Sequence, residues 1–286
     1  MKAKIGIIGG SGLHDPDIVS GAKEIEVSTP FGQPSGKIIV GTLGDKEVAF
    51  LQRHGAGHKI SPSEINVRAN IYALKKLGVT HIISSCTVGS LKEEIKPMDI
   101  VILDQLFDRT RQRQATFFER GIVAHIKFSL PFCPQLSSLL GRVISKKGYS
   151  YHPKGTYVCM EGPQFSTKAE SNEYRRAGFD IIGMTAIPEA KLAREAEICY
   201  ATIATVTDYD VWKENEVDIQ IVIENMRKNM AAVRNIIMDA VPEIQDERSC
   251  ECKNALDDAI VTSKDFITRG TRKRLDLLIG KYMAKS

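Results

Sequence analysis

The chain has 286 residues, 43% hydrophobic and 26% charged, which is ordinary for a soluble globular protein with a full core. Its net charge of +4 is too small an excess to indicate a nucleic-acid or membrane-surface protein, although it suits a small anionic substrate. No apolar run approaches the ~20 residues of a membrane span, and the first residues show no signal-peptide pattern. We therefore expect a cytoplasmic protein.

The N-terminal strand predicted over residues 5–9 breaks into a glycine-rich turn that contains Ser11. Glycines let a backbone approach a ligand closely, so the amide groups of this turn and the Ser11 hydroxyl suit an anion. A dinucleotide-binding fingerprint would require a glycine at position 15, where Asp15 stands. The alternative is a tight turn without a ligand, because glycine most often serves turns.

Residues 37–52 alternate apolar and polar side chains around a Gly-Asp pair, which predicts a β-hairpin. The second strand leads into a glycine-rich loop that carries Arg53, His54 and His58. Arginine offers a fixed fork of charged donors and histidine a further donor, so this loop suits a phosphate. A surface Arg-His pair without a function is the alternative.

A helix is predicted from Ser61 through Leu77, with a proline near its first turn and a glycine beyond its end. The buried strand that follows, residues 79–84, is closed by a loop of small residues at 86–90. Ligands of open α/β sheets lie beyond the carboxyl ends of strands, so the loops after these three strands are placed to meet at one site. The arginine-rich segment 109–113 is predicted first as a solvated loop or subunit contact and second as a substrate flap.

The rest of the chain continues the alternation of strands and helices. We predict strands at 99–104, 157–160, 180–186 and 198–204, and helices at 135–147, 167–176, 188–197 and 218–240, the last ending before Pro242. Such alternation without an internal repeat indicates an α/β fold. A polar linker follows at 245–249, so we expect one domain over residues 1–245 and a helical C-terminal extension over 246–286, packed on the core or on a neighbouring subunit.

Two carboxylates, Asp208 and Asp210, follow the buried strand predicted at 198–204. If the extended geometry continues through residue 210, both side chains lie on one face. Like charges held together raise the pKa of one carboxyl, which then stays protonated near neutral pH and acts as an acid. A solvated loop with two turn-forming aspartates is the alternative.

Six cysteines occur at positions 86, 133, 159, 199, 250 and 252. None shows the spacing of a zinc-ligand pair, since Cys250 and Cys252 are one residue too close together. We therefore predict no metal site. Cysteines stay reduced in a mesophile's cytosol but form internal disulfides in hyperthermophiles, and composition leaves both states open.

Several short motifs, taken together and in order, resemble the nucleoside phosphorylase family over residues 4–243. They are Gly-Ile-Ile-Gly-Gly-Ser-Gly-Leu at 6–13, Thr-Pro-Phe-Gly at 29–32, Arg-His-Gly at 53–55, Gly-Ser-Leu at 89–91, Glu-Gly-Pro at 161–163 with Phe165 and Ser166, Met-Thr at 184–185, and Thr-Asp-Tyr-Asp at 207–210 with Trp212. The likeness is strongest to members that cleave 5′-methylthioadenosine. It implies a single α/β domain with a central twisted mixed β-sheet flanked by helices.

The resemblance also implies a reaction: reversible phosphorolysis, in which phosphate attacks C1′ of the thioribose as the bond to N9 of adenine breaks. No metal or organic cofactor is implied, and inorganic phosphate is a co-substrate. The implied partners are the small-molecule nucleoside and phosphate, with neither nucleic acid nor membrane. Family members share sites across trimer interfaces, so we expect a homotrimer or a dimer of trimers.

The family's site residues transfer to this chain position by position. The resemblance assigns phosphate to Ser11, Arg53, His54 and Thr185, with Cys86 and Thr87 adding backbone or hydroxyl donors. It places Met184 under the ribose, Phe165 and Ser166 near the purine, Ile219 and Val222 around the 5′-methylthio group, and His58 and His125 near the same end, His125 from a neighbouring subunit. A core or surface histidine without a role in the site is the alternative for His125. Asp208 is our choice for the acid that protonates N7, and Asp210 for the group that receives the 6-amino group, although their order stays open.

The chain departs from the family pattern at a few positions. Cys86-Thr87 stands where Thr or Asn followed by Ala is usual, and Gln164 replaces a common Arg. The tail after residue 245 resembles that of heat-loving archaeal members, which implies a thermophilic protein with disulfides. The pairs expected from this resemblance are Cys133 with Cys199 and Cys250 with Cys252.

Two other functions stay open at the level of sequence. Phosphorolysis of a 6-oxopurine nucleoside or of 5′-methylthioinosine is the alternative within the family, and Asp210 argues against it because Asn at this position would suit a 6-oxo base. A nucleotide-binding Rossmann-type protein is the alternative outside the family, and the missing third glycine argues against it.

Overall fold

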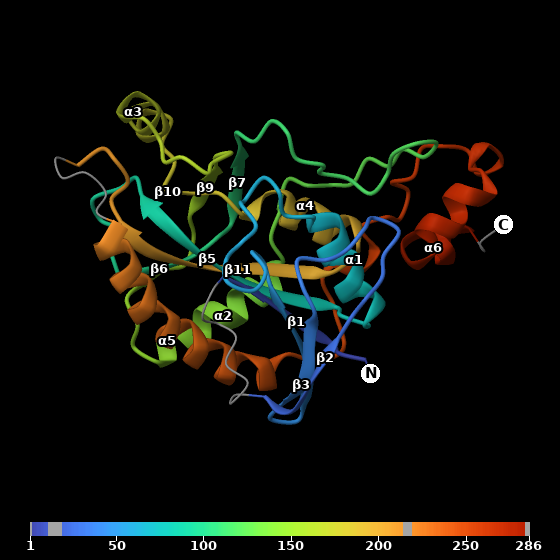
Figure 1. Ribbon diagram of the computed structural model, residues 1–286, viewed down its shortest axis with the longest axis horizontal. Helices are drawn as coiled ribbons and strands as arrows, with labels where there is room; N and C mark the ends of the chain where they lie inside the picture. The colour runs from blue at the N-terminus through green and yellow to red at the C-terminus, as the bar shows by residue number, and fades with distance from the viewer. Residues whose placement is uncertain (1, 11–18, 214–218, 284–286) are drawn as a thin grey trace.

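The computed structural model describes residues 2–10, 19–213 and 219–283. These form an 11-stranded mixed sheet in the order β2-β3-β4-β1-β5-β10-β9-β7, while β11 pairs with β5 and β6, and β6 with β8 (Figure 1). The strands are β1 (Ile5–Gly9), β2 (Ser20–Ile25), β3 (Ile38–Leu43), β4 (Lys46–Gln52), β5 (His81–Ser90), β6 (Ile100–Ile102), β7 (Gln105–Asp108), β8 (Tyr151–His152), β9 (Thr156–Cys159), β10 (Ile181–Gly183) and β11 (Cys199–Asp208). The predicted mixed α/β sheet is therefore confirmed.

The two longest strands, β5 and β11, form the centre of the sheet. They run parallel from Cys199 opposite His81 to Val206 opposite Val88, and β1 lies parallel on the other side of β5. Every residue of β11 before Asp208 is buried, because its apolar and β-branched side chains face packed layers on both sides. The carboxyl ends of β1, β5 and β11 consequently point toward the same edge of the sheet.

Helices cover both faces of this sheet. They are α1 (Val67–Lys76), α2 (Pro134–Lys146), α3 (Lys168–Arg176), α4 (Ala186–Glu195), α5 (Ile219–Glu243) and α6 (Arg269–Met283). One apolar layer joins α2 and α5 to the sheet, and a second joins α1 and α4 to its opposite face (Figure 1). Within the described residues, no helix combines the length and apolar character that crossing a membrane requires.

Two predicted helix boundaries are wrong. Residues 61–64 form a turn closed by the Ser61 hydroxyl on Glu64, and α1 begins only after Asn66, whose side chain accepts the Ala69 amide. At the other end of the chain, α5 continues through Pro242. Proline disrupts a helix interior by removing an amide and crowding the preceding turn, but Pro242 lies one residue from the helix end, where little of the helix remains to be disrupted.

The C-terminal extension contains two short 3-10 turns, η2 (Glu251–Asn254) and η3 (Lys264–Phe266), followed by α6. Leu275, Leu278 and Ile279 of α6 are buried in the same apolar layer as α1 and α4. Glu197, at the turn before β11, accepts the Leu256 amide and the Lys281 ammonium group. In this chain the extension therefore packs on its own core, while the predicted division at residue 245 stays a prediction.

The disulfide prediction is wrong. All six cysteines are free thiols, and Cys199 Sγ lies 3.3 Å from Cys250 Sγ, well beyond the ~2.05 Å of a disulfide bond. The expected pairs do not form because Cys133, Cys199, Cys250 and Cys252 gather at one point, with all four sulfurs within 4.8 Å of one another. The expectation of a thermophilic protein thereby loses the disulfides that supported it.

Candidate active site

A cavity of about 280 Å³ lies at the carboxyl ends of the central strands. Its walls come from the end of β1, the loop after β4, the second half of β5, β10, the end of β11 and one face of α5. The strand ends predicted to meet do meet here, because parallel neighbours deliver their carboxyl ends to a common edge. The loop predicted at 86–90 is wrong, since these residues continue strand β5. Ser11 lies outside the described residues.

Arg53 forms the buried floor of the cavity and is held by a carboxylate from a distant helix. Its Nε lies 2.5 Å from Glu189 Oε1, and its Nη2 donates to Glu189 Oε2 at 3.2 Å and to Ser84 Oγ at 2.7 Å. Its Nη1 donates to the Ser85 carbonyl at 2.9 Å. Burial alone would lower the pKa of Arg53, but the charge and the hydrogen bonds of Glu189, with smaller contributions from other groups, together raise it, so the guanidinium stays charged.

These bonds change what Arg53 can offer a ligand. A guanidinium has five N–H groups, and four of those of Arg53 are engaged within the described protein, which leaves one on Nη1. Glu189 is itself fully buried and also accepts the Tyr200 hydroxyl at 2.9 Å. Arg53 therefore presents a single rigidly aimed donor at the cavity rather than the two-pronged fork expected from sequence.

His54 lines the same end of the cavity as a neutral ring. Its Nδ1 lies 2.8 Å from the Ile60 carbonyl oxygen and therefore donates, and its ring stacks on His58 with centroids 4.1 Å apart. Burial, with a smaller contribution from the charge of Arg53, lowers the pKa of His54 to about 4. At neutral pH its Nε2 is thus an acceptor, where the sequence predicted a donor.

The other predicted phosphate residues also line the cavity. Thr87 is exposed to it from β5, whereas the neighbouring Cys86 is buried, with a thiol pKa raised to about 12 by burial. Thr185 precedes α4, and its side chain makes no capping hydrogen bond, so the hydroxyl is available to a ligand. Cys86 stands at the family's Thr/Asn position, and the hydroxyl exposed to the cavity belongs to the next residue, Thr87.

Asp208 and Asp210 both border the cavity, but they do not share one face of a strand. β11 ends at Asp208, whose Oδ1 accepts the Asp210 amide at 2.8 Å, and Asp210 has a φ of 52°. The prediction of continuous extended geometry is therefore wrong, because this side-chain bond bends the chain. Gly89 makes room for the pair, since a Cβ there would meet Asp208 Oδ1 at 3.0 Å and Asp210 Cβ at 3.3 Å.

The two carboxyls differ in their hydrogen bonds. Asp208 accepts from Asp210 and, at 2.7 Å, from the Thr207 hydroxyl. Asp210 is buried, and its Oδ2 has no hydrogen-bond partner within the described part of the chain. Burial raises the pKa of both carboxyls. For Asp210, interactions with the Ser171 hydroxyl and the Val211 amide lower the pKa in part, and the charge of Asp208 raises it further. A buried acceptor without a donor is costly, so Asp210 Oδ2 is prepared for a donor from a ligand.

Met184 and Phe165 are the next two predicted site residues. Both line the cavity, and Phe165 is half exposed on the loop that follows Gly162. Gly162 has a φ of 68°, and a Cβ on it would lie only 2.5 Å from Met184 Sδ, so a larger residue would displace Met184. Ser166 does not line the cavity: it is buried, and its hydroxyl contacts Met160 Sδ at 3.6 Å.

An apolar stripe of α5 closes the remaining wall. Val222, Met226, Met230 and Val233 line the cavity at helical spacing, and α5 is fixed there by Asn225 and Asn229, which donate to carbonyls of β11. Val222 and His58 are placed in the cavity as predicted. The side chain of Ile219 lies outside the described residues. His125 is exposed on the segment paired with the C-terminal extension and does not line the cavity of its own chain.

Residues 4–242 match the family model described as the phosphorylase superfamily. The chain belongs to this superfamily. Two curated relatives, from Koribacter versatilis and Geobacter sulfurreducens, are named S-methyl-5′-thioadenosine phosphorylase and are 50% and 51% identical to it. The first alignment covers 100% of this chain and 98% of the relative, and the second covers 99% and 100%.

Solved structures resemble this phosphorylase along nearly its whole length. A methylthioadenosine phosphorylase from an antarctic soil metagenomic library is 47% identical with a TM-score of 0.93, covering 97% of this chain and 99% of that one. The Schistosoma mansoni methylthioadenosine phosphorylase in complex with adenine is 40% identical with a TM-score of 0.81, covering 86% and 93%.

Three features of this phosphorylase site were missed by sequence reasoning. Glu189 gave no signal, since its partner Arg53 lies 136 residues away in the chain. Arg113 was predicted in a solvated segment, yet its buried guanidinium donates to the Met184 and Ile187 carbonyls and pairs with Glu161, holding two cavity loops together. The two methionines of α5 could have been found, because they repeat at i+4 from Val222.

Proposed function

We propose that this phosphorylase catalyses the reversible phosphorolysis of 5′-methylthioadenosine, giving adenine and 5-methylthioribose 1-phosphate. The observation that carries this proposal is the buried Asp210 oxygen without a donor, on a residue that lines the same cavity as Arg53. Adenine offers the missing donor through its 6-amino group. The apolar stripe of α5 favours a methylthio group over the 5′-hydroxyl of an unmodified nucleoside. Relatives named for this activity support the proposal.

In the proposed reaction, a phosphate oxygen forms a bond to C1′ while the C1′–N9 bond breaks and its electron pair leaves with the purine. Asp208, whose carboxyl pKa is raised by burial, gives a proton to N7 of the departing base. Asp210 accepts a hydrogen bond from the 6-amino group. Holding phosphate beneath C1′ turns a bimolecular step into one within the complex, which contributes further to the rate.

At the phosphate end, Arg53 gives its one remaining N–H while Thr87 and Thr185 give hydroxyls. The neutral ring of His54 accepts the hydrogen of a P–OH group at Nε2, so the site suits monohydrogen phosphate. The opposite charges of Arg53 and Glu189 offset each other. The anion is therefore held mainly by directed hydrogen bonds and less by net charge.

The reaction itself is tested by adding 5′-methylthioadenosine to the purified protein with and without inorganic phosphate. We expect adenine to appear only when phosphate is present, in equal amount to the sugar phosphate, because phosphate is the nucleophile. Release of adenine at the same rate without phosphate would contradict the proposal and indicate hydrolysis instead.

Replacing Asp210 with Asn is expected to shift base preference toward a 6-oxopurine by about ten- to a hundredfold, the value of one hydrogen bond to a charged group. Asn tolerates the left-handed backbone of Asp210, and its amide can donate to a 6-oxo group. The measurement is the ratio of kcat/KM for 5′-methylthioadenosine to that for 5′-methylthioinosine. An unchanged ratio would contradict the role of Asp210.

We also propose that the enzyme acts in the cytoplasm as a homotrimer or a dimer of trimers. Its six free cysteines suit a reducing compartment. The exposed His125, which does not line the cavity of its own chain, is proposed to complete the site of a neighbouring subunit.

A further inference from the structure

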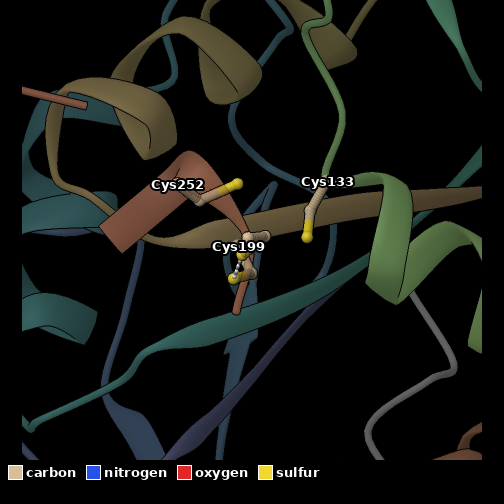
Figure 2. A group of neighbouring side chains, drawn as sticks. Cys133, Cys199 and Cys252 are labelled. Atoms are coloured by element: carbon tan, nitrogen blue, oxygen red, sulfur yellow. Dashed lines mark hydrogen bonds between the residues drawn. The ribbon is translucent and has the colours of Figure 1, made fainter. Parts of the chain in front are cut away.

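Four cysteine sulfurs converge on the side of the sheet away from the catalytic cavity. Cys133 immediately precedes α2, Cys199 is the first residue of β11, and Cys250 and Cys252 belong to the start of the C-terminal extension. All four are buried, and their sulfurs lie within 4.8 Å of one another. Figure 2 shows Cys133, Cys199 and Cys252 reaching one shared space from these three separate segments.

The spacing of the sulfurs fits a metal better than it fits covalent pairs. A tetrahedral zinc site with Zn–S bonds of about 2.3 Å separates its sulfurs by about 3.8 Å. Here the Cys199–Cys250 separation is 3.3 Å and no separation among the four sulfurs exceeds 4.8 Å, so the sulfurs are about as close together as such a site requires. Small side-chain rotations would bring four sulfurs to one centre. The short Cys-x-Cys spacing is no obstacle, because the other two ligands come from elsewhere in the chain.

Cysteine binds metals as the thiolate, and one feature of the cluster's surroundings favours that form. Cys133 lies at the N-terminus of α2, where the helix dipole favours negative charge.

A metal ion also has a route to the cluster. Cys133 and His81 line a surface cleft that continues along Gln135 and Ser249, next to the start of the extension.

We propose that Cys133, Cys199, Cys250 and Cys252 bind one Zn²⁺ ion in a closed structural site. Each thiol that is still protonated releases its proton to solvent as its sulfur binds, and the completed site of four thiolates and one Zn²⁺ carries a charge of about −2. Four protein ligands leave no open position, so the site performs no chemistry on substrate. Its role is to fasten the C-terminal extension to the start of β11 and to α2.

The test is metal analysis of the full-length protein, expressed with zinc and purified under reducing conditions without chelator. We expect about one zinc per chain, and after exchange with Co²⁺ the intense thiolate-to-cobalt absorption of a tetrahedral sulfur site. Replacing both Cys250 and Cys252 with Ser is expected to abolish both signals. Cys159→Ser, a change at a buried cysteine outside the cluster, is the matched control and is expected to retain them.

A second measurement tests whether zinc fastens the C-terminal extension to the core, and it uses the wild-type protein. Removing zinc with a chelator is expected to lower Tm and to make the chain after residue 245 susceptible to limited proteolysis, while re-addition of zinc restores both. Two outcomes would each overturn the proposal: wild-type protein that retains less than about a tenth of a zinc per chain after equimolar loading, or zinc-loaded protein in which mass spectrometry finds these four cysteines paired as disulfides.

Discussion

Replacing Asp208 with Asn is expected to lower kcat for 5′-methylthioadenosine by about two to four orders of magnitude, the usual contribution of a positioned general acid. Asn has nearly the shape of Asp but no proton to give to N7. The fold should tolerate the change, because the amide oxygen can still accept the Asp210 amide as Asp208 Oδ1 does. Steady-state kinetics with saturating phosphate measure the loss, and thermal unfolding checks that the variant is folded.

The pH dependence separates an acid from a residue that only positions the substrate. Burial raises the pKa of Asp208, and the reaction needs its protonated form, so wild-type kcat should fall as pH rises through that raised pKa. In Asp208→Asn this decline should disappear from the remaining activity. Asp45→Asn, a change at an exposed turn residue, is the matched control and should leave the pH profile intact. Retention of more than about a tenth of wild-type kcat would refute the role of Asp208 as acid.

The fold was predictable from the sequence where the local residue pattern and the long-range packing favour the same element. β11 was predictable because seven consecutive apolar or β-branched residues suit a strand buried on both faces, and the β3–β4 hairpin because alternation and a Gly-Asp turn coincide. The course of the chain after Asp208 was not predictable in this way. One side-chain hydrogen bond to the Asp210 amide decides it, and such bonds compete with strand geometry without changing the apolar pattern.

The site was partly predictable for a related reason. Arg53, His54 and Asp210 follow strands and Asp208 ends one, and the carboxyl ends of parallel strands meet, so local motifs placed them in one cavity. What those groups do depends on their hydrogen-bond partners. Glu189, together with Ser84 and Ser85, leaves Arg53 one available donor, and the Ile60 carbonyl fixes the tautomer of His54. Neither pairing leaves a periodic or compositional trace in the sequence.

The cysteines illustrate the same limit. Their spacing argued against a zinc pair, and likeness to related tails argued for disulfides, yet both arguments treat cysteines two at a time. The structure brings together four sulfurs from three segments, at the start of α2, the start of β11 and the C-terminal extension. Only the packing of that extension against the sheet creates the group.

Replacing Glu189 with Gln is expected to lower the free energy of unfolding by about 3–5 kcal/mol, because it leaves the charge of Arg53 buried without its counter-ion. The pKa of Arg53 is too high for the guanidinium to escape by losing its proton. The matched control is Glu173→Gln, which breaks the exposed Glu173–Arg176 pair and should cost about 0–1 kcal/mol. Urea unfolding in phosphate-free buffer measures the free energy of unfolding of both variants. Equal losses would show that the buried ion pair stabilises the protein no more than the exposed pair does.

Phosphate should partly reverse this loss, which links the ion pair to the anion site. In Glu189→Gln the guanidinium of Arg53 lacks a negative partner, and phosphate bound at the adjoining end of the cavity supplies one. A ligand that binds only the folded state stabilises it by RT ln(1 + [L]/Kd), where [L] is the free ligand concentration. Tighter binding of phosphate therefore appears as a larger increase in Tm. Phosphate is therefore expected to raise Tm more in the variant than in the wild type, with kcat reduced because Arg53 is no longer aimed by Glu189. An equal phosphate-dependent shift in both proteins would mean that the anion does not bind beside Arg53.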